Sequence, residues 1–130
     1  MELLPEGQTN TSTEVTLSDQ RKINKFSTLI YKKDTVVARR DALRVEKEYL
    51  DDLTMELELL DEDETVNYKV GDGFIEMRVS DALERVEGEL ERLGGEIDGL
   101  EEEIDGFDSE LGELKVALYD KFGKNINLER

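Results

Sequence analysis

Hydrophobic residues recur at alternating steps of four and three along the second half of the chain. They are Val79, Leu83, Val86, Leu90, Leu93, Ile97, Leu100, Ile104, Phe107, Leu111, Leu114 and Leu118. Two apolar positions in every seven form one narrow seam along a helix, which is typical of a coiled coil. The pattern therefore predicts a helix over about residues 79–122 that packs against a partner helix, and it argues against disorder.

The first half of the chain shows a similar pattern that weakens in its middle. Arg39 and Glu46 occupy seam-like positions there, and the stretch contains no glycine or proline. Apolar residues otherwise keep the spacing at Ile23, Phe26, Leu29, Ile30, Val36, Leu43, Leu50, Leu53, Leu57 and Leu60. The spacing predicts a helix over about residues 16–62. Thr16 followed by Asp19 resembles a capping box at its start, with Ser18 as the alternative cap.

Between the two predicted helices, the pattern over about residues 65–78 changes to a period of two around the turn Gly71-Asp72-Gly73. The apolar residues of this segment are Val66, Tyr68, Val70, Phe74, Ile75 and Met77. The pattern predicts a β-hairpin. Because a lone two-stranded hairpin is marginal in water, we expect it to join strands from other chains. A hairpin folded back on its own helices is the alternative.

Charge favours an antiparallel arrangement of the two helices. Basic residues lie mid-length in the first helix, at Lys32, Lys33, Arg39, Arg40, Arg44 and Lys47. Acidic residues lie at the opposing depth of the second helix, at Glu96, Asp98, Glu101, Glu102, Glu103 and Asp105. Exposed ion pairs contribute only about 0–1 kcal/mol each, so the pattern sets orientation more than stability.

Six glycines interrupt the second helix, and none of them falls on the seam. They are Gly88, Gly94, Gly95, Gly99, Gly106 and Gly112. Each costs about 1 kcal/mol against alanine, so together they weaken the helix by roughly 5 kcal/mol. The second helix must therefore depend on its partner, and the Gly94-Gly95 pair is a candidate soft point.

Composition excludes several classes of function. The 130 residues carry a net charge of −17, and such a surface repels nucleic acid. The chain has no cysteine and no histidine, which removes thiolate chemistry and the commonest general base. No apolar run is long enough to span a membrane, and residues 1–14 predict a flexible tail without the pattern of a secretion signal.

The runs of carboxylates do not make a metal site or a catalytic site. Asp61 and Asp63 occupy alternate ligand places of a calcium loop, but Thr65 and Val66 stand where a ligand and the required glycine belong. Two helices and a hairpin also build no walled pocket that would shift carboxyl pKa values for acid–base work. We therefore expect no enzyme activity, no metal and no cofactor, and calcium binding is the weakest alternative.

In an antiparallel pair, the start of the first helix and the end of the second lie together, and an apolar tail follows the Gly123 cap. The apolar residues of this end are Ile23, Phe26, Leu118, Tyr119, Phe122, Ile126 and Leu128. We expect Ile23, Phe26 and Leu118 to pack in the seam. Because the seam ends there, we expect Phe122, Ile126 and Leu128 to be exposed. Exposed apolar groups indicate a surface that meets other proteins.

Three stretches make the chain resemble β-type prefoldin subunits over about residues 15–129. The first helix starts with VTLSDQRKINKFS, the hairpin contains YKVGDGFI, and the chain ends with LKVALYDKFGKNINLE. The two terminal stretches are specific, whereas the coiled-coil middle is generic heptad sequence. The resemblance implies a mainly α fold, in which a long antiparallel two-helix coiled coil carries a central β-hairpin that joins an oligomeric β-barrel. The resemblance implies that residues 15–130 form this domain.

The resemblance also implies a function. The six apolar hairpin residues would be barrel strands, and the seven apolar residues of the chain ends would form a client-binding tip. The complex would be an ATP-independent hexameric co-chaperone of two α-type and four β-type subunits. In eukaryotes it hands unfolded actin and tubulin to the cytosolic group II chaperonin. We accordingly expect a cytoplasmic protein, with the nucleus as a second compartment. The alternative is a coiled-coil scaffold or adaptor subunit that binds no clients.

Overall fold

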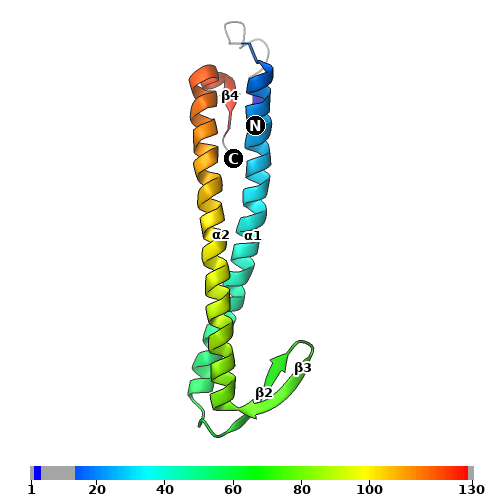
Figure 1. The fold of residues 1–130 in the computed structure, drawn as a ribbon, viewed down its shortest axis with the longest axis vertical. Helices are drawn as coiled ribbons and strands as arrows, with labels where there is room; N and C mark the ends of the chain where they lie inside the picture. The colour runs from blue at the N-terminus through cyan, green and yellow to red at the C-terminus, as the bar shows by residue number, and fades with distance from the viewer. Residues whose placement is uncertain (1, 4–13, 129–130) are drawn as a thin grey trace. The chain divides into compact units, whose positions relative to one another are not determined.

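The computed structural model describes residues 2–3 and 14–128, and its elements are two long helices and short strands (Figure 1). Residues 1 and 4–13 of the predicted N-terminal tail lie outside the described residues. In chain order the elements are β1 (Glu2–Leu3), α1 (Leu17–Glu58), β2 (Thr65–Val70), β3 (Gly73–Arg78), α2 (Val79–Phe122), the 3-10 helix η2 (Gly123–Asn125) and β4 (Ile126–Asn127). The fold is therefore mainly helical, with one β-hairpin between the helices.

The chain divides into two compact units. The terminal unit comprises residues 1–37 and 102–130, and the hairpin unit comprises residues 38–101. Each unit contains one part of α1 and one part of α2, and the two parts run antiparallel. No helix in the described part of the chain is long and apolar enough to cross a membrane.

The core of the terminal unit is one apolar cluster between α1, α2 and the residues that follow α2. Its buried members are Phe26, Leu29, Leu111, Leu118, Phe122, Ile126 and Leu128, with Ile23, Ile30, Phe107, Leu114 and Tyr119 packed against them. The Lys33 Nζ atom lies 2.6 Å from Asp108 Oδ1 across the two helices. The antiparallel pairing expected from seam spacing and charge is therefore present in this unit.

The hairpin unit has two apolar clusters along the same kind of seam. One contains Leu57, Val79, Ala82 and Val86, with Leu50, Leu53, Val66, Tyr68, Met77, Leu83 and Leu90 packed against it. The other contains Leu43, Leu93 and Ile97, with Leu50 and Leu100 packed against it. Arg44 pairs with Glu101, and Arg39 Nη2 lies 3.8 Å from Glu96 Oε2. These cross-helix pairs confirm the antiparallel orientation within this unit.

Helix α1 ends at Glu58, earlier than the position near residue 62 that the apolar spacing predicts. The Leu59 N–H donates to Glu56 O and the Leu60 N–H donates to Leu57 O, which tightens the last turn. Leu60 consequently leaves the seam and is 40% exposed, so its predicted place in the seam is wrong. The chain then turns toward the hairpin. The Val79 N–H donates to Glu64 O and the Ser80 N–H to Glu62 O, which satisfies donors at the start of α2.

The two strands of the hairpin pair in register from Thr65 opposite Arg78 to Val70 opposite Gly73. Gly71 has a φ of 61°, and no residue other than glycine has a positive φ in the described part of the chain. A positive φ at only the first of two turn positions is the pattern of a type II′ turn, which matches the right-handed twist of paired strands. The tight turn thus fixes the register of β2 and β3.

Asp19 links the start of α1 to the end of α2 in the terminal unit. The Asp19 N–H donates to Thr16 Oγ1 at 3.1 Å and the Thr16 N–H donates to Asp19 Oδ2 at 3.0 Å, which confirms the predicted capping box. Lys121 near the end of α2 also donates to Asp19 Oδ2. The hydrogen bond from Lys121, helped by that from Thr16, lowers the pKa of Asp19 from 3.8 to about 2.

The depressed pKa of Asp19 predicts an acid-sensitive contribution to stability. Because the pKa is lower in the folded state, the contribution is complete above about pH 4 and is lost as the pH falls toward 2. Asp19→Asn is expected to lower the unfolding midpoint at neutral pH and to flatten the pH dependence between 4 and 2. Thermal unfolding measured across this pH range checks the prediction. Glu110→Gln is the control for loss of one charge, because Glu110 is exposed. Equal slopes for Asp19→Asn and the native chain would contradict the assignment.

Open space around the α2 glycines predicts a gain in stability on substitution. A Cβ added at Gly94 meets no atom within 4 Å, and the residue is helical. Gly94→Ala is therefore expected to raise the free energy of unfolding by about 0.5–1 kcal/mol. Gly123→Ala is the contrasting control, because its φ of 57° favours glycine and the change is expected to cost about 1 kcal/mol. Urea unfolding followed by circular dichroism measures both, and a loss of stability in Gly94→Ala would refute the reasoning.

Candidate functional site

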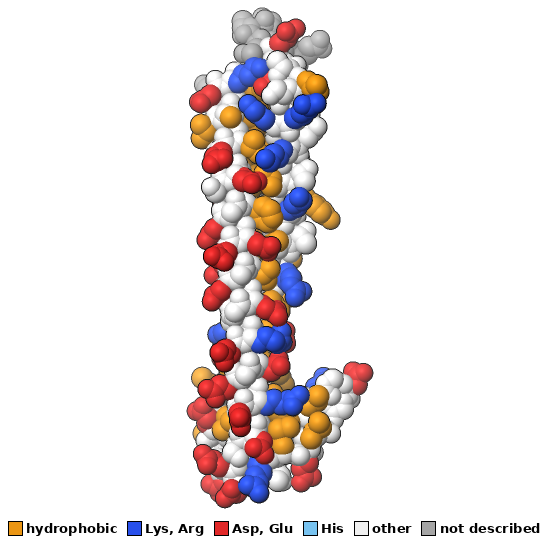
Figure 2. All heavy atoms as spheres, viewed as in Figure 1, with side chains coloured by type: hydrophobic (Ala, Val, Ile, Leu, Met, Phe, Trp, Pro, Cys, Tyr) orange, Lys and Arg blue, Asp and Glu red, His pale blue; other side chains and the backbone are white. Residues whose placement is uncertain are grey.

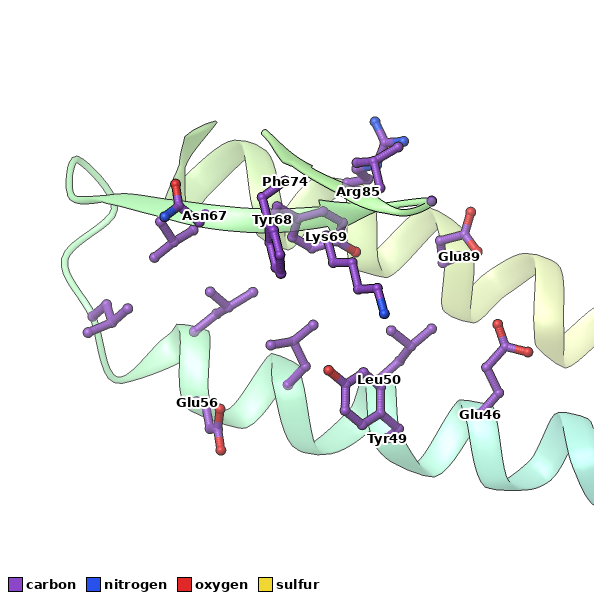
Figure 3. A pocket seen from close by; sticks show the side chains of 16 residues that line it. Glu46, Tyr49, Leu50, Glu56, Asn67, Tyr68, Lys69, Phe74, Arg85 and Glu89 are labelled. Carbon is purple, nitrogen blue, oxygen red and sulfur yellow. The ribbon is translucent and has the colours of Figure 1, made fainter. Parts of the chain in front are cut away.

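The hairpin unit contains a hollow of about 800 Å³ between the hairpin and the last turns of α1 (Figure 3). Its floor is apolar and comes from α1, its roof is β2, and α2 supplies Arg85 and Glu89 at one side. The lining residues from α1 are Glu46, Tyr49, Leu50, Leu53, Glu56, Leu57 and Leu60. From the hairpin they are Val66, Asn67, Tyr68, Lys69, Val70, Gly71 and Phe74. The hollow is thus apolar at its base and charged at its rim.

The lining pattern indicates which part of β2 borders the hollow. Successive side chains of a strand point to opposite faces, so a space that touches one face meets every second residue. This hollow meets six successive residues, Val66–Gly71. We infer that the edge of β2, with its backbone groups, borders the hollow. Among the described strands β2 pairs only with β3, so this edge has no strand partner there.

The structure places the six predicted hairpin residues in two environments. Val66, Tyr68 and Met77 pack against the apolar cluster of their own helices, and Val70 is half-buried. Phe74 and Ile75 are 68% and 50% exposed. The hairpin therefore lies partly on its own helices, as in the alternative interpretation. Its outer edges have no strand partner among the described residues, and it presents two large exposed apolar side chains.

Tyr68 fixes the hairpin over the helices. The Arg85 guanidinium carbon lies 5.9 Å from the centre of the Tyr68 ring, within the range of a cation–π contact. Burial raises the pKa of the Tyr68 hydroxyl, and the positive charge of Arg85 opposes that shift. Within the described residues, no group of three acidic side chains is arranged to hold a metal ion. The chemistry of the hollow is that of apolar contact and backbone pairing.

One exposed apolar side chain of α1 that lies off the seam, Tyr49, lines the hollow and is 65% exposed. Met55 on α1 and Leu59 just after its end are 66% and 86% exposed but do not line the hollow. In Figure 2, hydrophobic side chains gather where the hairpin meets the helices. The sequence signal for Tyr49 is an apolar side chain that lies off the seam, on the part of the first helix nearest to the hairpin in the sequence. Contiguous exposed apolar surface of this kind marks a site of protein–protein contact.

The second candidate surface is the apolar end of the terminal unit, where the structure brings all seven predicted tip residues into one cluster. Phe26 and Leu118 are buried and Ile23 is half-buried, which confirms the expected seam packing. The expected exposure of Phe122, Ile126 and Leu128 is wrong, because they are only 2–5% exposed.

The tail is buried because it folds back over the seam after Gly123. Strand β4 pairs with β1, so that Leu3 lies opposite Ile126 and Glu2 opposite Asn127. The Leu128 N–H donates to Tyr119 Oη at 3.3 Å. Strand β1 was not predicted from the sequence, because two residues are too few to show a period.

Charge separates the two helices in the terminal unit. In Figure 2, lysine and arginine side chains gather over the α1 part of this unit, and acidic side chains lie over the α2 part. Arg21, Lys25 and Lys32 are exposed there. Positive and negative charge are therefore unevenly distributed at this end of the fold.

The chain is similar to known proteins both in sequence and in fold. Residues 20–125 match the family described as Prefoldin subunit. The chain is 54% identical to prefoldin subunit 4 of Saccharomyces cerevisiae, over 100% of both chains. It is 35% identical to prefoldin subunit 4 of Homo sapiens, over 88% of this chain and 87% of that one.

The fold also matches a solved structure. The crystal structure of the prefoldin beta subunit from Thermococcus strain KS-1 matches with a TM-score of 0.78, over 85% of this chain and 96% of that one. The sequences are 17% identical, so this match concerns the fold alone. The family match and the similarity to the two subunit 4 proteins rest on sequence instead. On these grounds the chain belongs to the prefoldin subunit family.

Proposed function

We propose that this chain is a β-type subunit of a hexameric, ATP-independent prefoldin, with two α-type and three further β-type subunits as partners. In this proposal the complex holds unfolded proteins of the actin and tubulin class and passes them to the cytosolic group II chaperonin. Family membership supports the co-chaperone role. The partners of this chain, its clients and its cytoplasmic location, with the nucleus as a second compartment, are part of the proposal.

The observation that carries the assembly role is a two-stranded hairpin with unpaired edges above an apolar hollow. An edge strand offers a row of unpaired N–H and C=O groups to any strand that can reach it. Closing several hairpins into a barrel removes all such edges. Of the exposed Phe74 and Ile75, which point to opposite faces of β3, the one that faces the inside of the barrel would lose contact with water at the same time. Burying that apolar surface favours association.

The backbone geometry identifies the donors that a neighbouring strand would use. Hydrogen-bonded and non-hydrogen-bonded pairs alternate along an antiparallel hairpin. With a two-residue loop, Val70 and Gly73 form the hydrogen-bonded pair that closes the turn. We infer that Asn67 and Lys69, which alternate with such pairs, direct their N–H groups to the free edge of β2. Glu76, opposite Asn67, does the same on β3.

The apolar cluster at the chain ends supports client holding. It offers Ile23 and Tyr119 as half-buried side chains beside a buried base of Phe26, Leu118 and Phe122. Weak contacts of this kind become effective when several arms of a complex hold one client, because the second contact is intramolecular. Weak contacts also separate without nucleotide hydrolysis. The burial of the tail residues favours the rival role, a coiled-coil scaffold without client binding, and the holding experiment below separates the two.

Proline at the free edge of β2 is expected to block assembly. Asn67→Pro removes one outward N–H and leaves the hairpin bonds in place, so the chain should fold but fail to reach the mass of a hexamer. Native mass spectrometry after co-expression with prefoldin partners measures this. Asn67→Thr is the matched control, since it keeps the N–H and suits a strand. A hexamer of normal stability with Asn67→Pro would refute pairing at this edge.

Polar substitutions at the half-buried tip residues are expected to weaken client holding. In the assembled complex, Ile23→Ser together with Tyr119→Ser should reduce the suppression of light scattering when a denatured protein is diluted into buffer. Val116→Ser is the matched control, because Val116 lies on α2 in the same unit and is 62% exposed. If the double variant suppressed light scattering as well as the native complex and the Val116→Ser control do, the scaffold role would be favoured.

A further inference from the structure

The end of the terminal unit holds the chain's own tail as an extended segment. After Gly123, η2 leads into β4, where Ile126 and Leu128 are 5% and 2% exposed and Asn127 between them is exposed. This alternation is that of a strand with one apolar face. The side chains of Ile126 and Leu128 belong to the same cluster as Phe26 and Leu118. The tail therefore occupies an apolar groove formed by α1 and α2.

The contacts of the tail depend little on its exact sequence. Tyr119 accepts a hydrogen bond from the backbone N–H of Leu128, and β1 pairs with the backbone of β4. The two tail side chains contribute apolar surface and no polar group. A groove built this way fits any extended segment that carries apolar side chains at alternate positions, and folded proteins bury such segments.

We propose that the tail is a resident competitor in this groove, which a client of the proposed chaperone, an extended segment of a non-native polypeptide with apolar residues at alternate positions, displaces. The inference rests on the proposed function, because it takes the ligand to be an unfolded protein. It goes further in naming the groove, the pattern it recognises and a competitor within the chain.

Several features make the tail displaceable. Strands β1 and β4 share only two residue pairs. The tail is joined to α2 through Gly123, whose φ of 57° already lies in the region that glycine adopts freely. A client segment can pair over a longer stretch than two residues. A resident competitor lowers the apparent affinity by the fraction of open groove, which keeps each grip weak and helps release without nucleotide.

A reversible tether across β1 and β4 tests the closed state. The chain has no cysteine, so Glu2→Cys with Asn127→Cys places one pair at directly opposite positions of the two strands. The variant is assembled into the complex and tested with a reduced, alkylated protein that cannot refold. Oxidation should lower binding at least about tenfold, and reduction should restore it, if the groove must open. Asn127→Cys alone is the control for oxidation of partner subunits.

Truncation tests the open state. A chain that ends at Asn125 should bind the same unfolded protein about tenfold more tightly than the full chain does, since the competitor is gone. It should also bind a labelled peptide, GKNINLER, that copies residues 123–130, whereas the oxidised double-cysteine variant should not. A peptide with serine in place of Ile126 and Leu128 is the matched control and should fail to bind.

The outcomes separate this inference from the proposed function. Holding that responds to neither closure nor truncation, while the complex still suppresses aggregation, overturns the groove and leaves the co-chaperone role intact. Weaker holding by the truncated chain also overturns it, because the tail would then be a client contact itself. If the assembled complex holds no unfolded protein in any form, the inference and the client-holding role fail together.

Discussion

The narrow apolar seam between α1 and α2 is the interaction on which the other features depend. In the terminal unit it joins Phe26 and Leu29 to Leu111 and Leu118, and in the hairpin unit it joins Leu57 to Val79 and Val86. The free energy gained from hydrophobic burial is roughly proportional to the apolar area buried. A seam with two apolar positions in seven buries little area for each residue. Cross-helix ion pairs add orientation more than free energy. The chain therefore satisfies one seam by itself and leaves other apolar surface for other uses.

The two candidate surfaces illustrate different uses of that remaining surface. Near the hairpin, Tyr49, Phe74 and Ile75 stay exposed, and the edge of β2 has no strand partner among the described residues. At the chain ends, the tail covers the seam with its own strand and a hydrogen bond to Tyr119. One surface is open and suited to permanent neighbours in an assembly. The other is closed and suited to a ligand that comes and goes.

The helices, the hairpin and their antiparallel order were predictable because each has a period that survives in the sequence. Seam spacing identifies α1 and α2, alternation identifies β2 and β3, and Gly71 marks the turn. The capping box at Thr16 and Asp19 was also predictable, since it depends on two residues three positions apart. These features are local, or they repeat along the chain.

The features that were missed depend on contacts between residues far apart in the chain. The burial of Ile126 and Leu128 depends on the chain folding back after Gly123 onto the cluster between α1 and α2, and on pairing with β1, which lies at the other end of the sequence and is too short to show a pattern. The early end of α1 depends on two tightened hydrogen bonds after Leu57. The hollow exists only where the hairpin stands away from α1, and single residues such as Tyr49 carry no sign of it. Seam spacing records which residues face a partner helix and gives no information on what closes the ends.

The glycines of α2 have a consequence for the life of the protein in the cell. Six residues without side chains leave α2 with little helical preference of its own, and an added Cβ would meet open space at each of them. Helix α2 therefore stays folded because it packs against α1. A chain in which this contact is lost exposes a long stretch of backbone to proteases. In the cell, degradation of the protein is then expected to follow how often this seam opens.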